Sequence, residues 1–179
     1  MNLAKIGSGQ RAPDVVNVII ENPEGENNKY EFDKELDVMR LDRVMYSAVF
    51  YPTDYGFVPQ TLCEDGDPLD AFVLSTNPIH PGTLVEVRPI GYIKMVDGGK
   101  RDDKLLCVPL HDARFTHIRD LKHVAPHTLE EIGHFLSTYK MLQKKKVEVS
   151  GWQNAAAAKK LIRESIKMFN DAKKHAPHS

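Results

Sequence analysis

Hydrophobic and polar residues alternate along the first part of the chain, which is the pattern of β-strands. In residues 15–21, one face carries the apolar side chains of Val16, Val18 and Ile20. The segment 22–28 is dense in turn-forming residues, and alternation resumes in residues 29–32. These segments predict a hairpin with Glu21, Lys29 and Glu31 on its polar side, although a solvated face with ordinary cross-strand charge pairs gives the same pattern.

Two more segments fit strands before the middle of the chain. Residues 36–45 are typical of a short strand pair, which carries Asp42 and Arg43. Residues 71–74 are continuously apolar and predict a buried strand.

A longer strand and its returning partner come next. Residues 84–96 fit one extended strand, in which Pro89 and Gly91 indicate a bulge or a bend. The pair Gly98-Gly99 predicts a hairpin loop, and residues 104–110 the returning strand.

The remainder of the chain shows helical periodicity. Thr128 and Glu131 fit a capping box. A helix from Thr128 to about residues 139–142 then has an apolar stripe made of Leu129, Ile132, Leu136 and Tyr139. After a short strand at 147–150, Asn154 predicts the start of a second helix with the stripe Ala158, Leu161, Ile162, Ser165, Ile166 and Phe169.

The order of these elements indicates the fold class. Many short strands followed by helices, with bends inside strands, favour an α+β protein built as a small closed antiparallel barrel with helices outside. We expect a single domain over residues 1–179, with an irregular arm at 1–14 and a frayed tail at 173–179.

Composition narrows the class further. The chain has 179 residues, with 41% hydrophobic and 27% charged, and a net charge of -1, which provides no overall basic field for nucleic acid. No apolar run is long enough for a membrane span, and the first residues lack a signal-peptide core. Cys63 and Cys107 do not suggest a disulfide framework, so we expect a cytoplasmic protein.

An acidic segment carries the most specific chemistry. Asp65, Asp67 and Asp70 lie within six residues, with Gly66 and Pro68 between them. Carboxylates this close repel one another unless a cation neutralises them, and oxygen ligands suit Mg²⁺ or Mn²⁺. A solvated acidic turn is the alternative, but the apolar segments on both sides favour a buried site.

Other residues extend this candidate site. A second carboxylate pair, Asp97 and Asp102, brackets the predicted turn. Cations and phenols that would hold anionic oxygens are Lys29, Arg43, Lys104, Lys140, Tyr51, Tyr55 and Tyr139. Together they indicate a small, highly charged phosphate compound hydrolysed by metal-activated water. The alternatives are a metal-dependent phosphoesterase or nuclease, a non-enzymatic oligonucleotide-binding module and a calcium-binding module.

The motifs also carry a family resemblance. The stretch Asp65-Gly66-Asp67-Pro68-Leu69-Asp70 closely resembles the signature of the soluble family I inorganic pyrophosphatases of bacterial type. Other matching segments follow in the family's order: Lys29-Tyr30-Glu31, Asp42-Arg43, Asp54-Tyr55-Gly56, Asp102-Asp103-Lys104 and Tyr139-Lys140. The resemblance runs from about Val15 to the last helix.

The resemblance implies a five-stranded barrel of oligonucleotide-binding topology that hydrolyses pyrophosphate to two phosphates with several Mg²⁺ ions. It implies that Asp67 is the general base and that Tyr55 belongs to the catalytic group. The implied substrate ligands are Lys29, Arg43, Tyr55, Lys104, Tyr139 and Lys140. The implied metal ligands are Asp65, Asp70, Asp97 and Asp102, with Glu21, Glu31 and Asp42 acting through water or behind the ligands.

The resemblance further implies a homohexamer. We expect Mn²⁺ or Zn²⁺ as substitute metals, and Ca²⁺ as an inhibitor because it is larger than Mg²⁺ and prefers longer bonds. Gly98 stands where relatives often carry an acidic residue, and Ser137 and Thr138 occupy helix positions used in subunit contacts in some relatives.

Overall fold

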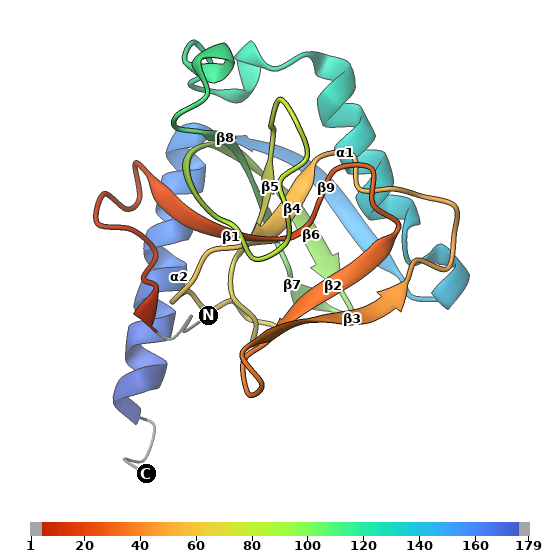
Figure 1. The fold of residues 1–179 in the computed structure, drawn as a ribbon, viewed down its shortest axis with the longest axis horizontal. Coiled ribbons are helices and arrows are strands. Elements are labelled where there is room, and N and C mark those ends of the chain that lie inside the picture. Colours follow the sequence, from red (N-terminus) through yellow and green to blue (C-terminus); the bar gives the residue numbers. More distant parts are fainter. Residues whose placement is uncertain (1–4, 176–179) are drawn as a thin grey trace.

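The computed structural model describes residues 5–175 as a mixed α+β fold (Figure 1). Its strands are β1 (Val16–Asn22), β2 (Asn28–Asp33), β3 (Val38–Val44), β4 (Asp54–Phe57), β5 (Asp70–Val73), β6 (Leu84–Asp97), β7 (Lys100–Arg101), β8 (Lys104–Pro109) and β9 (Val147–Asn154). Its helices are α1 (Pro126–Thr138) and α2 (Ala155–His175), with short 3₁₀ turns η2 (Ala113–Phe115), η3 (Leu121–His123) and η4 (Met141–Gln143).

Five strands pair in a closed circuit, in the order β1-β4-β5-β8-β6 and back to β1. Four of these pairings are antiparallel, but β5 and β8 are parallel. The prediction of a wholly antiparallel arrangement is therefore wrong. The reason is geometric, because strand direction cannot alternate all the way round a circuit with an odd number of members.

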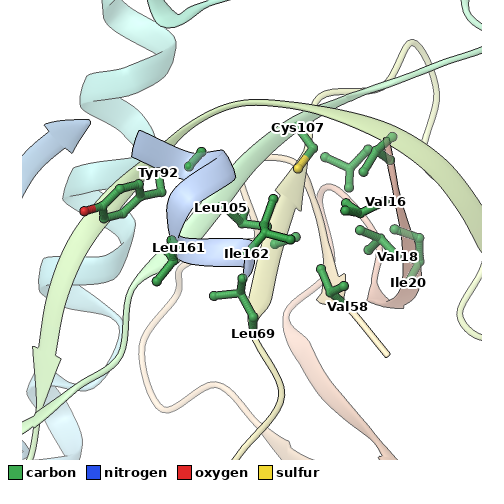
Figure 2. Close-up of a cluster of buried hydrophobic side chains, with 14 residues drawn as sticks. Val16, Val18, Ile20, Val58, Leu69, Tyr92, Leu105, Cys107, Leu161 and Ile162 are labelled. Atoms are coloured by element: carbon green, nitrogen blue, oxygen red, sulfur yellow. The ribbon is translucent and has the colours of Figure 1, made fainter. Parts of the chain in front are cut away.

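Two apolar clusters lie on the two faces of the central strands. Along β5, Ala71 and Val73 join one cluster and Phe72 joins the other. The first cluster is closed by Leu161 and Ile162 of α2, which lie over Leu105 and Leu69 (Figure 2). The second is closed by α1. Because these strands are buried on both faces, their sequences are continuously apolar instead of alternating.

The predicted long strand and its hairpin are confirmed. The register of β6 against β8 shifts between Pro89 and Gly91, where the sequence indicates a bulge. Beyond this point β6 turns at Gly98 and Gly99, both at positive φ, and pairs with β7.

The predicted hairpin of the first two strands is wrong. β1 pairs with β4 and β6, whereas β2 pairs with β3. Residues 36–45 were predicted to form a pair of short strands, but they contain the single strand β3. Side chains join β1 to β2 instead: the Tyr30 N–H donates to Asn22 Oδ1 at 2.6 Å and the Phe32 N–H to Glu21 Oε1 at 2.8 Å.

The strand β4 has no counterpart in the sequence prediction. Asp and Gly are both poor strand formers, so the four residues of β4 give a weak local signal. Gly56 is required by packing, because a Cβ there would lie 1.9 Å from the carbonyl oxygen of Ile19 on β1. β4 therefore forms because its backbone packs closely against β1, and not because its residues favour strands.

The helix predictions hold except at one end. α1 begins at Pro126, and the N–H of Thr128 donates to the Ala125 carbonyl at 3.1 Å, so Thr128 lies inside the first turn and the predicted capping box is wrong. Proline suits this first position because it lacks an N–H and has a helical φ. Asn154 caps α2 as predicted, accepting from the Ala157 N–H at 3.0 Å.

The ends of the chain are only partly described. Of the predicted tail, residues 173–175 still belong to α2, and 176–179 lie outside the described residues, as do residues 1–4 of the predicted arm. Both cysteines are free thiols. Neither helix in the described part of the chain combines the length and apolar character needed to cross a membrane.

Candidate active site

A cavity of about 240 Å³ lies at the end of the circuit where β5 and β8 begin. It gathers ten of the residues predicted for the site: Lys29, Tyr55, Asp65, Asp67, Asp70, Asp97, Asp102, Lys104, Tyr139 and Lys140. Tyr51, Phe135 and Leu136 complete its lining. Segments that are far apart in the sequence therefore meet at one site.

The acidic loop before β5 is folded by its own hydrogen bonds. The Asp67 carbonyl accepts from the Cys63 N–H at 2.8 Å, and the Asp67 N–H donates to Asp65 Oδ1 at 3.0 Å. Gly66 lies between them at a φ of 98°, a backbone conformation that favours glycine. The loop thus presents two carboxylates beside Asp70, the first residue of β5.

Lys104 holds two strands of the site together. It is the cross-strand partner of Asp70, and its Nζ lies 2.6 Å from Asp70 Oδ2 while also contacting Asp102. Burial alone would lower the pKa of Lys104, but the two carboxylates raise it above its usual range. Burial raises the pKa of Asp102 to about 6, with Asp70 adding to the shift and Lys104 opposing it.

The carboxyl end of α1 supplies the opposite wall. Tyr139 stacks on Phe135, with ring centroids 5.3 Å apart. Lys140 turns toward the hairpin and forms an ion pair with Asp97, its side chain only 14% exposed. Lys140 is therefore part of the cavity wall and is not a solvated surface lysine.

A second cavity of about 200 Å³ adjoins the first, with Lys29, Tyr55, Asp67 and Asp70 lining both. It adds two of the predicted residues, Glu21 and Glu31. Burial raises the pKa of Glu21 to about 8, although the Phe32 N–H opposes the shift. Lys34 also lines this cavity, and nothing in its sequence pattern distinguished it from a solvated lysine.

The two residues predicted to be catalytic face both cavities. Burial, and then the charges of Asp65 and Asp70, raise the pKa of Asp67 above its ordinary value. The Tyr55 hydroxyl donates to Asp70 Oδ2 at 2.5 Å. Burial raises the pKa of Tyr55 well above its ordinary value, so this phenol remains a proton donor at neutral pH.

Two predicted residues lie next to the cavities without lining them. In the described part of the chain, neither cavity is lined by Asp42 or Arg43 of β3. They reach the site through Lys29, whose Nζ is 3.6 Å from Asp42 Oδ2 and whose cross-strand partner is Arg43. The Nε of Arg43 is buried without a hydrogen-bond partner among residues 5–175.

Sequence reasoning assigned no role in the site to Phe135 and Leu136 and no specific role to Tyr51. Tyr51 was one of several candidate phenols, and its ring lies 5.5 Å from Tyr55 and 5.1 Å from Phe135. A signal for Phe135 and Leu136 was present, because residues three and four positions before Tyr139 share its helix face.

The donor set of the first cavity suits hard divalent cations. Five carboxylates face three lysines there, a formal excess of two negative charges, and no cysteine or histidine takes part. Over residues 5–175, however, no group of three His, Cys, Asp or Glu side chains is arranged to hold a metal ion. The carboxylates of Asp70, Asp97 and Asp102 instead contact lysines. The carboxylates of this cavity fit Mg²⁺ in chemistry and charge, and in this structure three of them form ion pairs with lysines.

Comparison with known proteins agrees with this site. A family model described as inorganic pyrophosphatase matches residues 18–170. The inorganic pyrophosphatase of a Nostoc species is 50% identical over 94% of this chain and 99% of its own length. That of Geobacillus stearothermophilus is 48% identical over 89% of this chain and 96% of its own. The crystal structure of the Thermus thermophilus inorganic pyrophosphatase, 46% identical, matches with a TM-score of 0.91 over 95% of this chain and 99% of that chain. The chain therefore belongs to the inorganic pyrophosphatase family, which confirms the resemblance of its motifs and the expectation of a hydrolase.

Proposed function

We propose that this protein hydrolyses inorganic pyrophosphate to two phosphates with Mg²⁺ held by the carboxylates of the first cavity. The observation that supports this proposal is the convergence of five carboxylates, three lysines and two tyrosines of the predicted site on one cavity. Membership of the family makes pyrophosphate the first substrate to test.

Asp65, Asp70, Asp97 and Asp102 are the proposed direct ligands of Mg²⁺, with Glu21, Glu31 and Asp42 acting through water. The bound metal would supply Lewis acidity, which neutralises phosphate charge and lowers the pKa of water. Mn²⁺ and Zn²⁺ are proposed substitutes. Ca²⁺, which is larger and prefers longer bonds, is the proposed inhibitor.

Asp67 is the proposed general base. Its raised pKa brings this carboxylate closer to the working pH, where a base is most effective. It would accept the proton of the attacking water at a carboxylate oxygen. Tyr55, which remains protonated, would fix Asp70 through its hydroxyl and offer a donor to a phosphate oxygen.

The cations would bind the two phosphoryl groups. Lys29, Lys104 and Lys140 line the cavity and would exchange their carboxylate partners for phosphate oxygens. Arg43, whose Nε has no hydrogen-bond partner among residues 5–175, and the Tyr139 hydroxyl would also contact the phosphoryl oxygens. Together they would stabilise the charge that develops on the leaving phosphate.

We also propose a homo-oligomer, with a hexamer suggested by the family resemblance. The support is a set of large apolar side chains that remain exposed just before, along and after β3, namely Leu36, Val38, Leu41, Val44, Tyr46 and Phe50. Sedimentation velocity tests this part, because a purely monomeric protein at micromolar concentration would contradict it.

A phosphate-release assay tests the activity. The protein should release phosphate from pyrophosphate with Mg²⁺, and excess chelator should abolish the release. Phosphate monoesters and phosphodiesters, assayed beside pyrophosphate, test the rival phosphoesterase function. Phosphate release that survives complete metal removal would overturn the proposed chemistry, and faster turnover of a diester would overturn the proposed substrate.

A further inference from the structure

The hairpin between β6 and β7 opens where it delivers Asp102 to the cavity. Val96 pairs with Arg101, and Ile93 pairs with Lys104, so the register is the same on both sides of residues 102 and 103. The Asp102 N–H donates to the Met95 carbonyl at 2.9 Å, as in an antiparallel ladder. In a regular ladder the Met95 N–H would donate to the Asp102 carbonyl in return. Here it donates instead to the side-chain Oδ1 of Asp103 at 3.1 Å.

The Asp103 carboxylate thus takes the position that a main-chain carbonyl holds in a regular ladder. Its other oxygen, Oδ2, accepts from Arg101 Nε at 2.6 Å, and its side chain is only 3% exposed. Asp103 and Arg101 lie on the outer side of the hairpin, where they line a small cavity with Glu164 and Ser165 of α2. Asp102 and Lys104 face the opposite way, into the first cavity.

Asp102 lies among other acidic side chains. Burial disfavours its charge and Asp70 and Asp65 repel its carboxylate, while Lys104, which contacts it, attracts it. The turn that precedes Asp102 contains Gly98 and Gly99, where an added Cβ would meet no atom of residues 5–175 within 4 Å, so the turn is open at these two positions. The contacts of Asp103 join the two strands directly beside Asp102.

We propose that Asp103, clamped by Arg101, is a positioning residue that fixes Asp102 for Mg²⁺ before the metal arrives. This inference rests on the proposed function, in which Asp102 is a metal ligand. Groups that orient metal ligands typically change metal affinity by about 10- to 100-fold when they are removed.

The test measures Mg²⁺ binding without substrate, by titration calorimetry, together with kcat and KM for magnesium pyrophosphate. Asp103→Ala should raise the Mg²⁺ dissociation constant by about 10- to 100-fold. Turnover should approach the wild-type value at saturating Mg²⁺, because Asp102 itself is intact. Asp103→Asn, which keeps an oxygen for the Met95 N–H, should show a smaller loss. Arg101→Met, which keeps the whole carboxylate, provides a second variant if Asp103→Ala folds poorly.

Asp112→Ala is the matched control. Asp112 also accepts a main-chain N–H, from Arg114 at 3.0 Å, and an arginine guanidinium two residues away, at 3.4 Å. The control should leave the Mg²⁺ dissociation constant within twofold of the wild type, even where its melting temperature falls. Unchanged Mg²⁺ affinity in Asp103→Ala and Arg101→Met, beside an active wild type, would overturn this inference alone. A wild type that neither binds Mg²⁺ nor hydrolyses pyrophosphate would overturn the proposed function and this inference with it.

Discussion

Replacing Lys104 by methionine tests whether the site carboxylates depend on a cation for their stability. Lys104 is 3% exposed in its side chain and contacts both Asp70 and Asp102. Methionine has a similar length and no charge, so Lys104→Met removes the cation while largely preserving volume. Two carboxylates, each less than a quarter exposed, then face each other across β5 and β8 without their partner.

The expected loss follows from the burial of this group. Removing one partner of a buried ion pair costs about 3–5 kcal/mol, because the remaining charge is uncompensated. For a chain of this size, 1 kcal/mol corresponds to about 2–4 °C in melting temperature. In excess chelator, Lys104→Met should therefore melt about 6–20 °C below the wild type. The loss should shrink near pH 5, below the Asp102 pKa of about 6, because this carboxyl then takes up a proton.

An exposed ion pair of equal length provides the control. Lys146 Nζ lies 2.6 Å from Glu148 Oε1, the same distance as Lys104 Nζ from Asp70 Oδ2, but its side chain is 84% exposed. Lys146→Met should melt within error of the wild type, since solvent compensates both charges. The comparison separates burial from contact distance.

Thermal melts with and without Mg²⁺ complete the assay. If Asp70 and Asp102 bind Mg²⁺, saturating metal should restore most of the stability that Lys104→Met loses. A loss in chelator below about 1 kcal/mol would refute the argument from burial. An equal loss with and without Mg²⁺ would refute the assignment of these carboxylates as metal ligands.

Further predictions concern the proposed base Asp67, the lysine that follows α1 and a buried glutamate. Asp67→Asn should lower turnover by about 10²–10⁴-fold with a smaller change in Mg²⁺ affinity, and near-wild-type turnover would contradict its role as base. Lys140→Ala should raise KM or lower kcat about tenfold, the size of one charge-assisted contact, and unchanged steady-state kinetics would return Lys140 to a structural ion pair with Asp97. Glu21 has a folded-state pKa of about 8, above its ordinary 4.5. Its protonation therefore adds to the free energy of unfolding in full below pH 4.5, and this stabilisation is lost as the pH rises to about 8. Denaturant unfolding of the metal-free protein at pH 5 and pH 8 should therefore show a larger drop for the wild type than for Glu21→Gln, and equal drops would contradict the raised pKa.

Much of the candidate site was predictable, because its chemistry is concentrated in short segments. Asp65, Asp67 and Asp70 are close in sequence, so their mutual repulsion can be inferred without a fold. Asp102 and Lys104 are two positions apart, so in an extended chain they lie on the same face, and the two side chains are in contact. The long strand β6 was also predictable, because its glycines and proline mark the bulge and the turn.

The parts that sequence reasoning missed depend on contacts between distant segments. β4 exists because Gly56 allows β1 to approach, and no local propensity reports that approach. Asp103 looked like one more acidic residue near a turn, whereas its carboxylate replaces a ladder carbonyl and pairs with Arg101. The ion pair of Lys140 with Asp97 joins residues 43 positions apart, so charge patterning along α1 could not reveal it.

The ion pairs of the cavity also bear on the order of binding. To accept a divalent cation alone, Asp70 and Asp102 would have to release Lys104, which would leave a buried ammonium without a partner. To accept a phosphate alone, Lys104 and Lys140 would have to leave their carboxylates unpaired in the same low-dielectric cavity. Each exchange carries the cost of an uncompensated buried charge. If metal and phosphate entered together, the carboxylates would exchange lysine for metal while the lysines exchanged carboxylate for phosphate, and none of these paired charges would be left without a partner. Under the proposed function, the pairing would therefore favour a magnesium–phosphate complex over either ion alone, and the lysines that stabilise the metal-free chain would also bind the substrate.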